Sequence, residues 1–147
     1  MSDTDLVKLY SGRILALAAD IPHLGHLPKP GGAAKKRSLL CGSTVAVEVV
    51  LADGKVAEFA QEVRACALGQ ASAAILGKIV IGRTRAELET ARTALTAMLN
   101  DGGPVPDAPF AGYAVLIPAR DYKNRHASIL LAIDATVAAI FAAEQNA

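Results

Sequence analysis

Residues 40–82 read LCGSTVAVEVVLADGKVAEFAQEVRACALGQASAAILGKIVIG, and this stretch decides the fold that the sequence predicts. Asp53-Gly54 separates two apolar runs in it, and an Asp-Gly pair between alternating apolar segments is a strong signal for a β-hairpin. The two cysteines of the chain flank these runs. Cys41 lies twelve residues before Asp53, and Cys66 lies twelve residues after Gly54. A hairpin that turns at Asp53-Gly54 therefore brings the two thiols together at its open end.

The alternation of apolar residues also predicts how the two strands pair. A two-residue turn would pair odd with even positions and place Glu58 opposite Val49, whereas a three-residue loop with a left-handed Gly54 pairs odd with odd. We prefer the second register because it keeps one face apolar. Its inward residues are Val45, Val47, Val49, Leu51, Ala57, Phe59 and Val63. Cys66 then lies about one residue from the position facing Cys41, at roughly 5–8 Å between Cβ atoms. This spacing suits a shared metal ion, and a disulfide only with adjustment.

Helical periodicity and capping residues predict four helices around the hairpin. Thr84 and Glu87, for example, have the spacing of a capping box at a helix start. The predicted helices cover approximately residues 2–19, 66–78, 85–99 and 125–143. The sequence therefore predicts a single α+β domain over residues 1–147. We expect a small antiparallel β-sheet centred on the hairpin of residues 44–63, packed on one face by four to five α-helices.

Residues 22–37, PHLGHLPKPGGAAKKR, predict a Pro/Gly-rich loop with a basic end. His23 and His26 have the H-x-x-H spacing of some metal sites, but a loop offers them no rigid support. Solvated histidines are the simpler interpretation. The basic triplet Lys35-Lys36-Arg37 is interpreted as a solvated rim, with docking of a partner as the alternative.

The composition argues against several functional classes. Charged residues make up 20% of the chain and the formal net charge is +1, so no electrostatic field favours nucleic acid. No uninterrupted apolar run approaches the ~20 residues of a membrane span. The acidic N-terminus lacks the pattern of a signal peptide, and two distant cysteines do not make a secreted disulfide framework. We therefore expect a cytoplasmic protein that binds neither nucleic acid nor membrane.

Two side chains at helix starts are candidates for chemistry. Cys66 begins the helix of residues 66–78, where the helix dipole and free N–H groups favour a thiolate. The alternative for Cys66 is a buried, inert thiol. His126 falls in the first turn of the last helix, where the dipole favours the neutral ring that a metal ligand needs. The alternative for His126 is a surface or hydrogen-bonded histidine.

Together these features resemble the U-type iron–sulfur cluster assembly scaffolds, the family of the NifU N-terminal domain, IscU and SufU. The likeness covers most of the chain and rests on three segments. Cys41-Gly42-Ser43 stands where the family opens its hairpin with Cys-Gly-Asp. Cys66-Ala67-Leu68, before a Ser/Ala-rich helix ending in Gly-Lys, stands where the family has a Cys-Ala-Ile-rich turn. His126-Ala127-Ser128-Ile129-Leu130 stands where IscU-like members have His-Cys-Ser-Ile-Leu.

The resemblance implies a scaffold rather than an enzyme. It implies that Cys41, Cys66 and His126 bind iron, a transient iron–sulfur cluster or zinc. Ser43 replaces the family's Asp and Ala127 replaces its third Cys, which is implicated in accepting sulfur from the cysteine desulfurase in many members. The implied site is therefore incomplete, and a partner chain or a second copy in a homo-oligomer could supply a fourth ligand. The implied partner is a cysteine desulfurase or another assembly protein.

Two other functions remain open at this stage. The missing Asp and Cys favour a degenerate, metal-free interaction module of the iron–sulfur assembly machinery. A zinc enzyme with an open coordination position is less well supported, because no Glu or Asp is securely placed as a general base.

Overall fold

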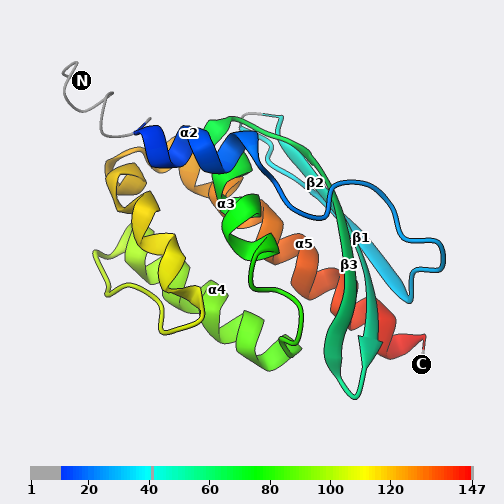
Figure 1. Ribbon diagram of the computed structural model, residues 1–147. Coiled ribbons are helices and arrows are strands. Elements are labelled where there is room, and N and C mark those ends of the chain that lie inside the picture. The colour runs from blue at the N-terminus through cyan, green and yellow to red at the C-terminus, as the bar shows by residue number, and fades with distance from the viewer. Residues whose placement is uncertain (1–10, 41, 147) are drawn as a thin grey trace.

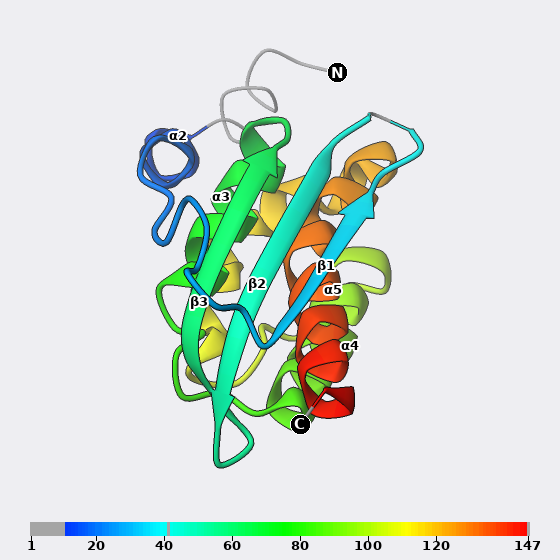
Figure 2. The same ribbon diagram turned by 90° about the vertical axis from the view of Figure 1, so that its right-hand side faces the viewer.

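Three antiparallel strands form a sheet in the order β1 (Gly32–Arg37), β2 (Thr44–Ala52) and β3 (Lys55–Arg64). This computed structural model describes residues 11–40 and 42–146. The described helices are α2 (Gly12–Ala19), α3 (Ala67–Gly77), α4 (Arg85–Asn100) and α5 (His126–Gln145), with the 3-10 helices η1 (Phe110–Asp121) and η2 (Lys123–Arg125) before α5. Helices α3, α4 and α5 lie behind the sheet in Figure 2, and α2 packs on α3 (Figure 1). The α+β fold with helices on one face is confirmed; the part of the first predicted helix in residues 2–10 lies outside the described residues.

The predicted odd-with-odd register of the hairpin is confirmed, with Val45 paired to Val63 and Val49 to Phe59. The turn itself differs from the expected three-residue loop. Ala52 pairs with Lys55 across a two-residue turn, and Asp53 and Gly54 both have positive φ, 52° and 75°. A two-residue turn alone would give the odd-with-even register, so the strands must shift elsewhere.

A β-bulge makes that shift. Val50 pairs with Glu58 and Leu51 with Val56, so Ala57 is the extra residue on β3. As a result Val56 is buried and Ala57 is exposed. The prediction that Ala57 faces inward was wrong, because the bulge reverses the direction of side chains between it and the turn.

The segment of residues 22–37, predicted to be a loop, ends in strand β1, which its sequence did not indicate. Its sequence, GAAKKR, lacks the β-branched and aromatic residues typical of strands. The strand forms because β2 offers a pairing edge and because Gly32 allows close contact with α5. The earlier part of the segment crosses to β3, where Gln61 N–H donates to His23 O at 2.9 Å and Gly25 N–H donates to Gln61 O at 3.0 Å.

Helix α5 is the core helix and packs against the sheet, α3 and α4. Its buried apolar residues include Ile129, Leu131, Ile133, Ala135, Ala139 and Ile140. With η2, the segment Lys123–Gln145 is long and apolar enough to cross a bilayer by length and composition alone. Most of its apolar window is buried inside the fold, so the hydropathy of α5 is explained by its place in the core.

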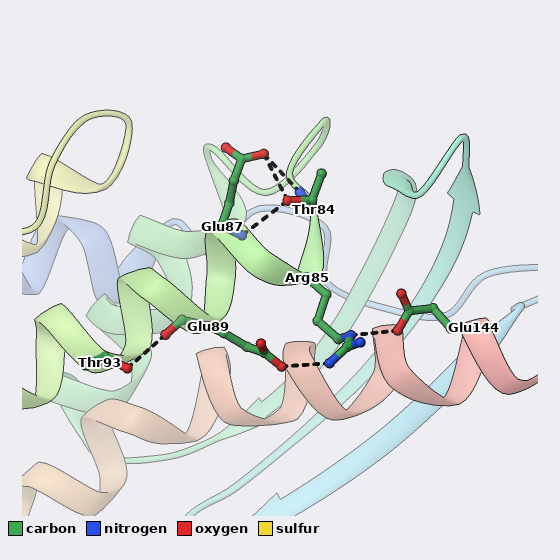
Figure 3. Close-up of polar contacts among 6 residues, drawn as sticks. All are labelled: Thr84, Arg85, Glu87, Glu89, Thr93 and Glu144. Carbon is green, nitrogen blue, oxygen red and sulfur yellow. Dashed lines mark hydrogen bonds and ion pairs between the residues drawn. The ribbon is translucent and has the colours of Figure 1, made fainter.

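The predicted capping box at the start of α4 is present. Thr84 Oγ1 accepts a hydrogen bond from Glu87 N–H, and Thr84 N–H donates to the Glu87 carboxylate, both at 3.2 Å (Figure 3). The next residue, Arg85, binds Glu89 of α4 and Glu144 of α5. These pairs connect the exposed sides of α4 and α5.

Candidate functional site

Cys66 lies at the N-cap of α3 as a free, half-buried thiol, so its predicted place at a helix start is confirmed. Its Sγ lies 3.5 Å from Ser128 Oγ in the first turn of α5. Ser128 Oγ in turn lies 3.2 Å from Ser43 Oγ, just before β2. Both serines are buried. The open end of the hairpin, the start of α3 and the start of α5 therefore meet at one small polar cluster.

Cys41 lies outside the described residues, so the closeness of the two thiols stays a prediction. Ser43, two residues along the chain, reaches the same Ser128 hydroxyl that contacts Cys66. Gly69 makes this meeting of α3 and α5 possible, because a Cβ there would lie 2.6 Å from Ser128 Oγ.

Several neighbours act on the pKa of Cys66. Partial burial acts to raise it, because burial disfavours the charged thiolate. Polar contacts from Ser128, from the backbone amides of Gly69 and Leu68, and from the Arg125 side chain act in the opposite direction and lower the pKa. The thiol makes no capping hydrogen bond to α3, so the two amides act on it as dipoles at the helix N-terminus. The polar contacts outweigh the effect of burial, so the pKa of Cys66 lies below its ordinary value.

The serine pair can follow the charge state of the sulfur. Each hydroxyl has one proton and two acceptor positions. While Cys66 is a thiol, Ser128 can accept a hydrogen bond from its S–H and donate one to Ser43. When Cys66 ionises, Ser128 can rotate to donate to Sγ. Ser43 can then donate to Ser128, so the chain of hydrogen bonds reverses without an unpaired group. An Asp at position 43 has no proton to donate when ionised, so it could not support the thiolate in this way.

We predict that Ser128→Ala raises the pKa of Cys66 and slows its alkylation at pH 7 by about threefold, because one stabilising donor is lost. The thiolate is the reactive form, so the rate-versus-pH profile should move to higher pH. The measurement is iodoacetamide labelling in a Cys41→Ser background, where Cys66 is the single remaining cysteine. Ser72→Ala is the matched control, because the buried Ser72 hydroxyl donates to Ile129 O instead. Identical profiles for Ser128→Ala and Ser72→Ala would contradict the role of Ser128.

His126 is buried, and both of its ring nitrogens face acceptors in the fold. Nε2 lies 2.9 Å from Ala119 O and 3.1 Å from Arg120 O, so this nitrogen must carry a proton. Nδ1 lies 2.8 Å from Asn100 Oδ1, at the end of α4. The neutral ring fits this setting if the Asn100 amide is turned so that its NH₂ group donates to Nδ1. His126 thus joins α4, η1 and α5.

The structure describes Cys66 and His126 of the predicted ligand set, whereas Cys41 lies outside the described residues. His126 would have to give up its contacts with Asn100 or with the η1 carbonyls before it could bind a metal. Ser43 and Ser128 carry neutral hydroxyls, and the exposed Ala127 has no donor atom. Within residues 11–40 and 42–146, no group of three His, Cys, Asp or Glu side chains is arranged to hold a metal ion.

Three partners of the site could not be recognised as such from the sequence: Ser128, Arg125 and Asn100. Ser128 follows His126 and Ala127 in the last motif, but only the fold shows that its hydroxyl reaches Cys66, 62 positions earlier. The contact of Asn100 with His126 is likewise long-range, across 26 positions. Periodicity and capping rules do not report contacts of this kind.

A NifU-like protein (N-terminal) from Brucella abortus has the same fold, in a crystal structure described as that of a nitrogen-fixing NifU-like protein. It is 45% identical to this chain, and the match covers 97% of this chain and 99% of that one, with a TM-score of 0.93. This chain belongs to the U-type scaffold family, as a NifU-like N-terminal domain. The family resemblance predicted from the cysteine and histidine motifs is therefore confirmed.

Two more distant structures share the NifU-like fold. One is assigned as an iron–sulfur cluster assembly scaffold for the SUF system of Fervidobacterium islandicum, with 19% identity, TM-score 0.82, and coverage of 91% of this chain and 98% of that one. The other is a hypothetical protein with 22% identity, TM-score 0.79, and coverage of 92% and 98%. At these identities the likeness shows the fold alone. No protein-family model matches the chain, and no curated protein matches it.

Proposed function

We propose that this chain is a non-enzymatic scaffold-type protein of iron–sulfur cluster assembly. It would receive iron with sulfide, or zinc, at Cys66 and Cys41, with His126 as a third ligand. The observation that supports this best is the half-exposed Cys66 with its lowered pKa, in a chain 45% identical to a NifU-like domain over nearly its whole length. A thiolate is the form in which cysteine binds metals.

The donor set makes the site incomplete, so we treat a cluster as transient cargo. A [2Fe–2S] cluster needs four ligands, and two Cys with one His leave one position for a partner chain or a second copy. Zinc could bind three protein ligands and a water. The proposed partner is a cysteine desulfurase or another assembly protein, in a cytoplasm that keeps the thiols reduced.

Anaerobic reconstitution tests this function directly. Protein purified without oxygen is supplied with iron and sulfide, or with zinc, and the bound metal and sulfide are measured per chain. We expect wild-type protein to bind metal, and Cys66→Ser and Cys41→Ser each to lose most of it. Ala127→Ser, which changes an exposed neighbour without removing a thiol, is the control. Equal binding by all four proteins would reject a thiol-based site.

Restoring the family's third cysteine should strengthen the site. We predict that Ala127→Cys raises the affinity for zinc or for a cluster by at least about tenfold, or ~1.4 kcal/mol, because a thiolate adds a fourth ligand. Ala127 is exposed beside the buried Ser128, so a thiol there can remain accessible. The measurement is competition with a chelator of known affinity.

Ala127→Ser is the matched control for this gain, since its hydroxyl is a poor ligand for a soft metal site. Ser43→Asp should add less than Ala127→Cys, because a carboxylate there also accepts the Ser128 hydrogen bond, which is then no longer available to Cys66. Equal affinities for wild type and Ala127→Cys would show that position 127 does not face the metal.

A second candidate is a metal-free interaction module of the assembly machinery. It is supported by the hydrogen bonds that occupy both nitrogens of His126 and by the two missing donors. Wild-type protein that binds no iron, sulfide or zinc under anaerobic conditions, but still binds a cysteine desulfurase, would favour this candidate.

A further inference from the structure

Several arginines of this chain bind carboxylates or carbonyl oxygens within the fold. Arg83 forms an ion pair with Glu87, and Arg92 forms one with Asp134. Arg85 forms ion pairs with both Glu89 and Glu144, which are drawn in Figure 3. Arg120 donates to the Met98 and Gly103 carbonyls after α4. By contrast, Lys35, Arg37 and Arg64 are exposed and form no ion pair with any residue in the described part of the chain. We call these three residues the basic sheet end.

The strand register places the basic sheet end on one face. Arg37 pairs with Thr44, which pairs with Arg64, so the two arginines flank one residue of the central strand. Lys35 lies one step further along the same face, opposite Ala46. The buried Val45 and Val47 point to the opposite face, toward α5, so this face is the outer one. Figure 2 shows that none of the helices in the described part of the chain covers it.

The outer face is hollowed at this end. A depression of about 400 Å³ is lined by Lys35, Gly42, Thr44, Ala46, Glu62 and Arg64. The central strand contributes only small side chains there, Thr44 and Ala46, so another backbone could approach closely. The one carboxylate in the lining, Glu62, already lies 3.3 Å from His26. The three cations of the basic sheet end outnumber this one carboxylate.

An apolar tip lies next to the depression along the chain. Leu39 and Leu40 are 92% and 75% exposed and precede Gly42 by a few residues. Ser43, which follows Gly42, belongs to the polar cluster around Cys66. The basic sheet end, the apolar tip and the proposed thiol site thus share one end of the molecule.

We propose that the basic sheet end docks an acidic, extended segment of a partner protein. Guanidinium groups bind carboxylates through paired, charge-assisted hydrogen bonds, and the small residues between Arg37 and Arg64 leave room for the segment's backbone. Glu48 and Glu62 on the same face would repel a uniformly anionic surface such as a membrane, whereas a protein segment can match both signs. This surface needs no metal, so the inference goes beyond the proposed function.

The test uses a fluorescein-labelled peptide of alternating glutamate and threonine, followed by fluorescence anisotropy at low ionic strength. The triple variant Lys35→Gln/Arg37→Gln/Arg64→Gln should bind it at least about tenfold more weakly. Each of the three exposed charge pairs should raise the affinity severalfold, and these factors multiply. The matched control is Arg13→Gln/Lys78→Gln/Lys123→Gln. It also removes three exposed positive charges, so both variants have a formal net charge of +1 − 3 = −2. We expect it to bind nearly as well as wild type.

Three results would overturn the proposal. Equal weakening in both triple variants would show that only net charge matters. Failure of wild-type protein to prefer the acidic peptide over its glutamine–threonine counterpart would show that no acidic segment is recognised. Binding of wild type to phosphatidylserine vesicles through Lys35, Arg37 and Arg64, without binding of the acidic peptide, would assign the surface to a membrane. Circular dichroism of each variant is the check that the exposed substitutions leave the fold intact.

Discussion

Gly32→Ala should lower the free energy of unfolding by about 3 kcal/mol, because the added methyl has no room between β1 and α5. A Cβ at Gly32 would lie 2.8 Å from the Ala143 Cα and closer still to the Ala139 carbonyl oxygen and the Ala143 nitrogen. These are backbone atoms of a buried helix, so a rotamer change cannot relieve the overlap. Either β1 must move away from α5, or α5 must shift in the core.

The measurement is urea denaturation followed by circular dichroism, and the matched control is the neighbouring Gly31→Ala. A Cβ at Gly31 meets its nearest atom, Val49 O, at 3.4 Å, so we expect a change within about 0.5 kcal/mol there. Because both variants reduce the freedom of the unfolded chain equally, their difference isolates the overlap. Equal stabilities of the two variants would show that β1 adapts without cost.

The close contact at Gly32 also explains why β1 could not be predicted from its sequence. Residues 32–37 have little intrinsic preference for a strand, and the sequence places prolines and glycines just before them. Pairing with β2 and packing on α5 decide their conformation, and both involve residues far along the chain. By contrast, the hairpin of β2 and β3 was predictable because its turn and its alternation are local.

The register shows where local rules reach their limit. The apolar alternation correctly required Val49 to face Phe59. It did not reveal whether a longer loop or a bulge achieves this. The structure has a bulge at Ala57, together with a two-residue turn in which Asp53 and Gly54 both have positive φ.

The site was predictable to a similar extent. Cys66 at the start of α3 followed from the end of the hairpin and from the helical period after it. Its contact with Ser128 and the hydrogen bonds of His126 depend on how α5 lies against α3 and η1, which short motifs do not encode. For Cys41, the ligand assignment still rests on the family resemblance.

His126→Ala should lower the free energy of unfolding of the metal-free protein by about 3 kcal/mol. The substitution removes a buried ring and leaves the carbonyls of Ala119 and Arg120 without this donor. The ring holds three elements together: Asn100 at the end of α4, Ala119 and Arg120 in η1, and α5 itself. The measurement is urea denaturation in buffer with a chelator. Asn100→Ala, which removes only the contact to Nδ1, is the graded control and should cost about 1 kcal/mol.

The same variants decide whether His126 also binds metal. Added zinc stabilises a folded protein by an amount that grows with its affinity, so the gain in unfolding free energy reports ligation apart from structural loss. If His126 is a ligand, zinc should stabilise wild type more than His126→Ala, and Asn100→Ala should bind at least as well as wild type because its ring is freer to turn. Equal gains in all three proteins would assign His126 to the fold alone and leave Cys66 and Cys41 as the proposed ligands. A loss well below about 1 kcal/mol for His126→Ala in the metal-free protein would instead show that the ring contributes little to holding α4, η1 and α5 together.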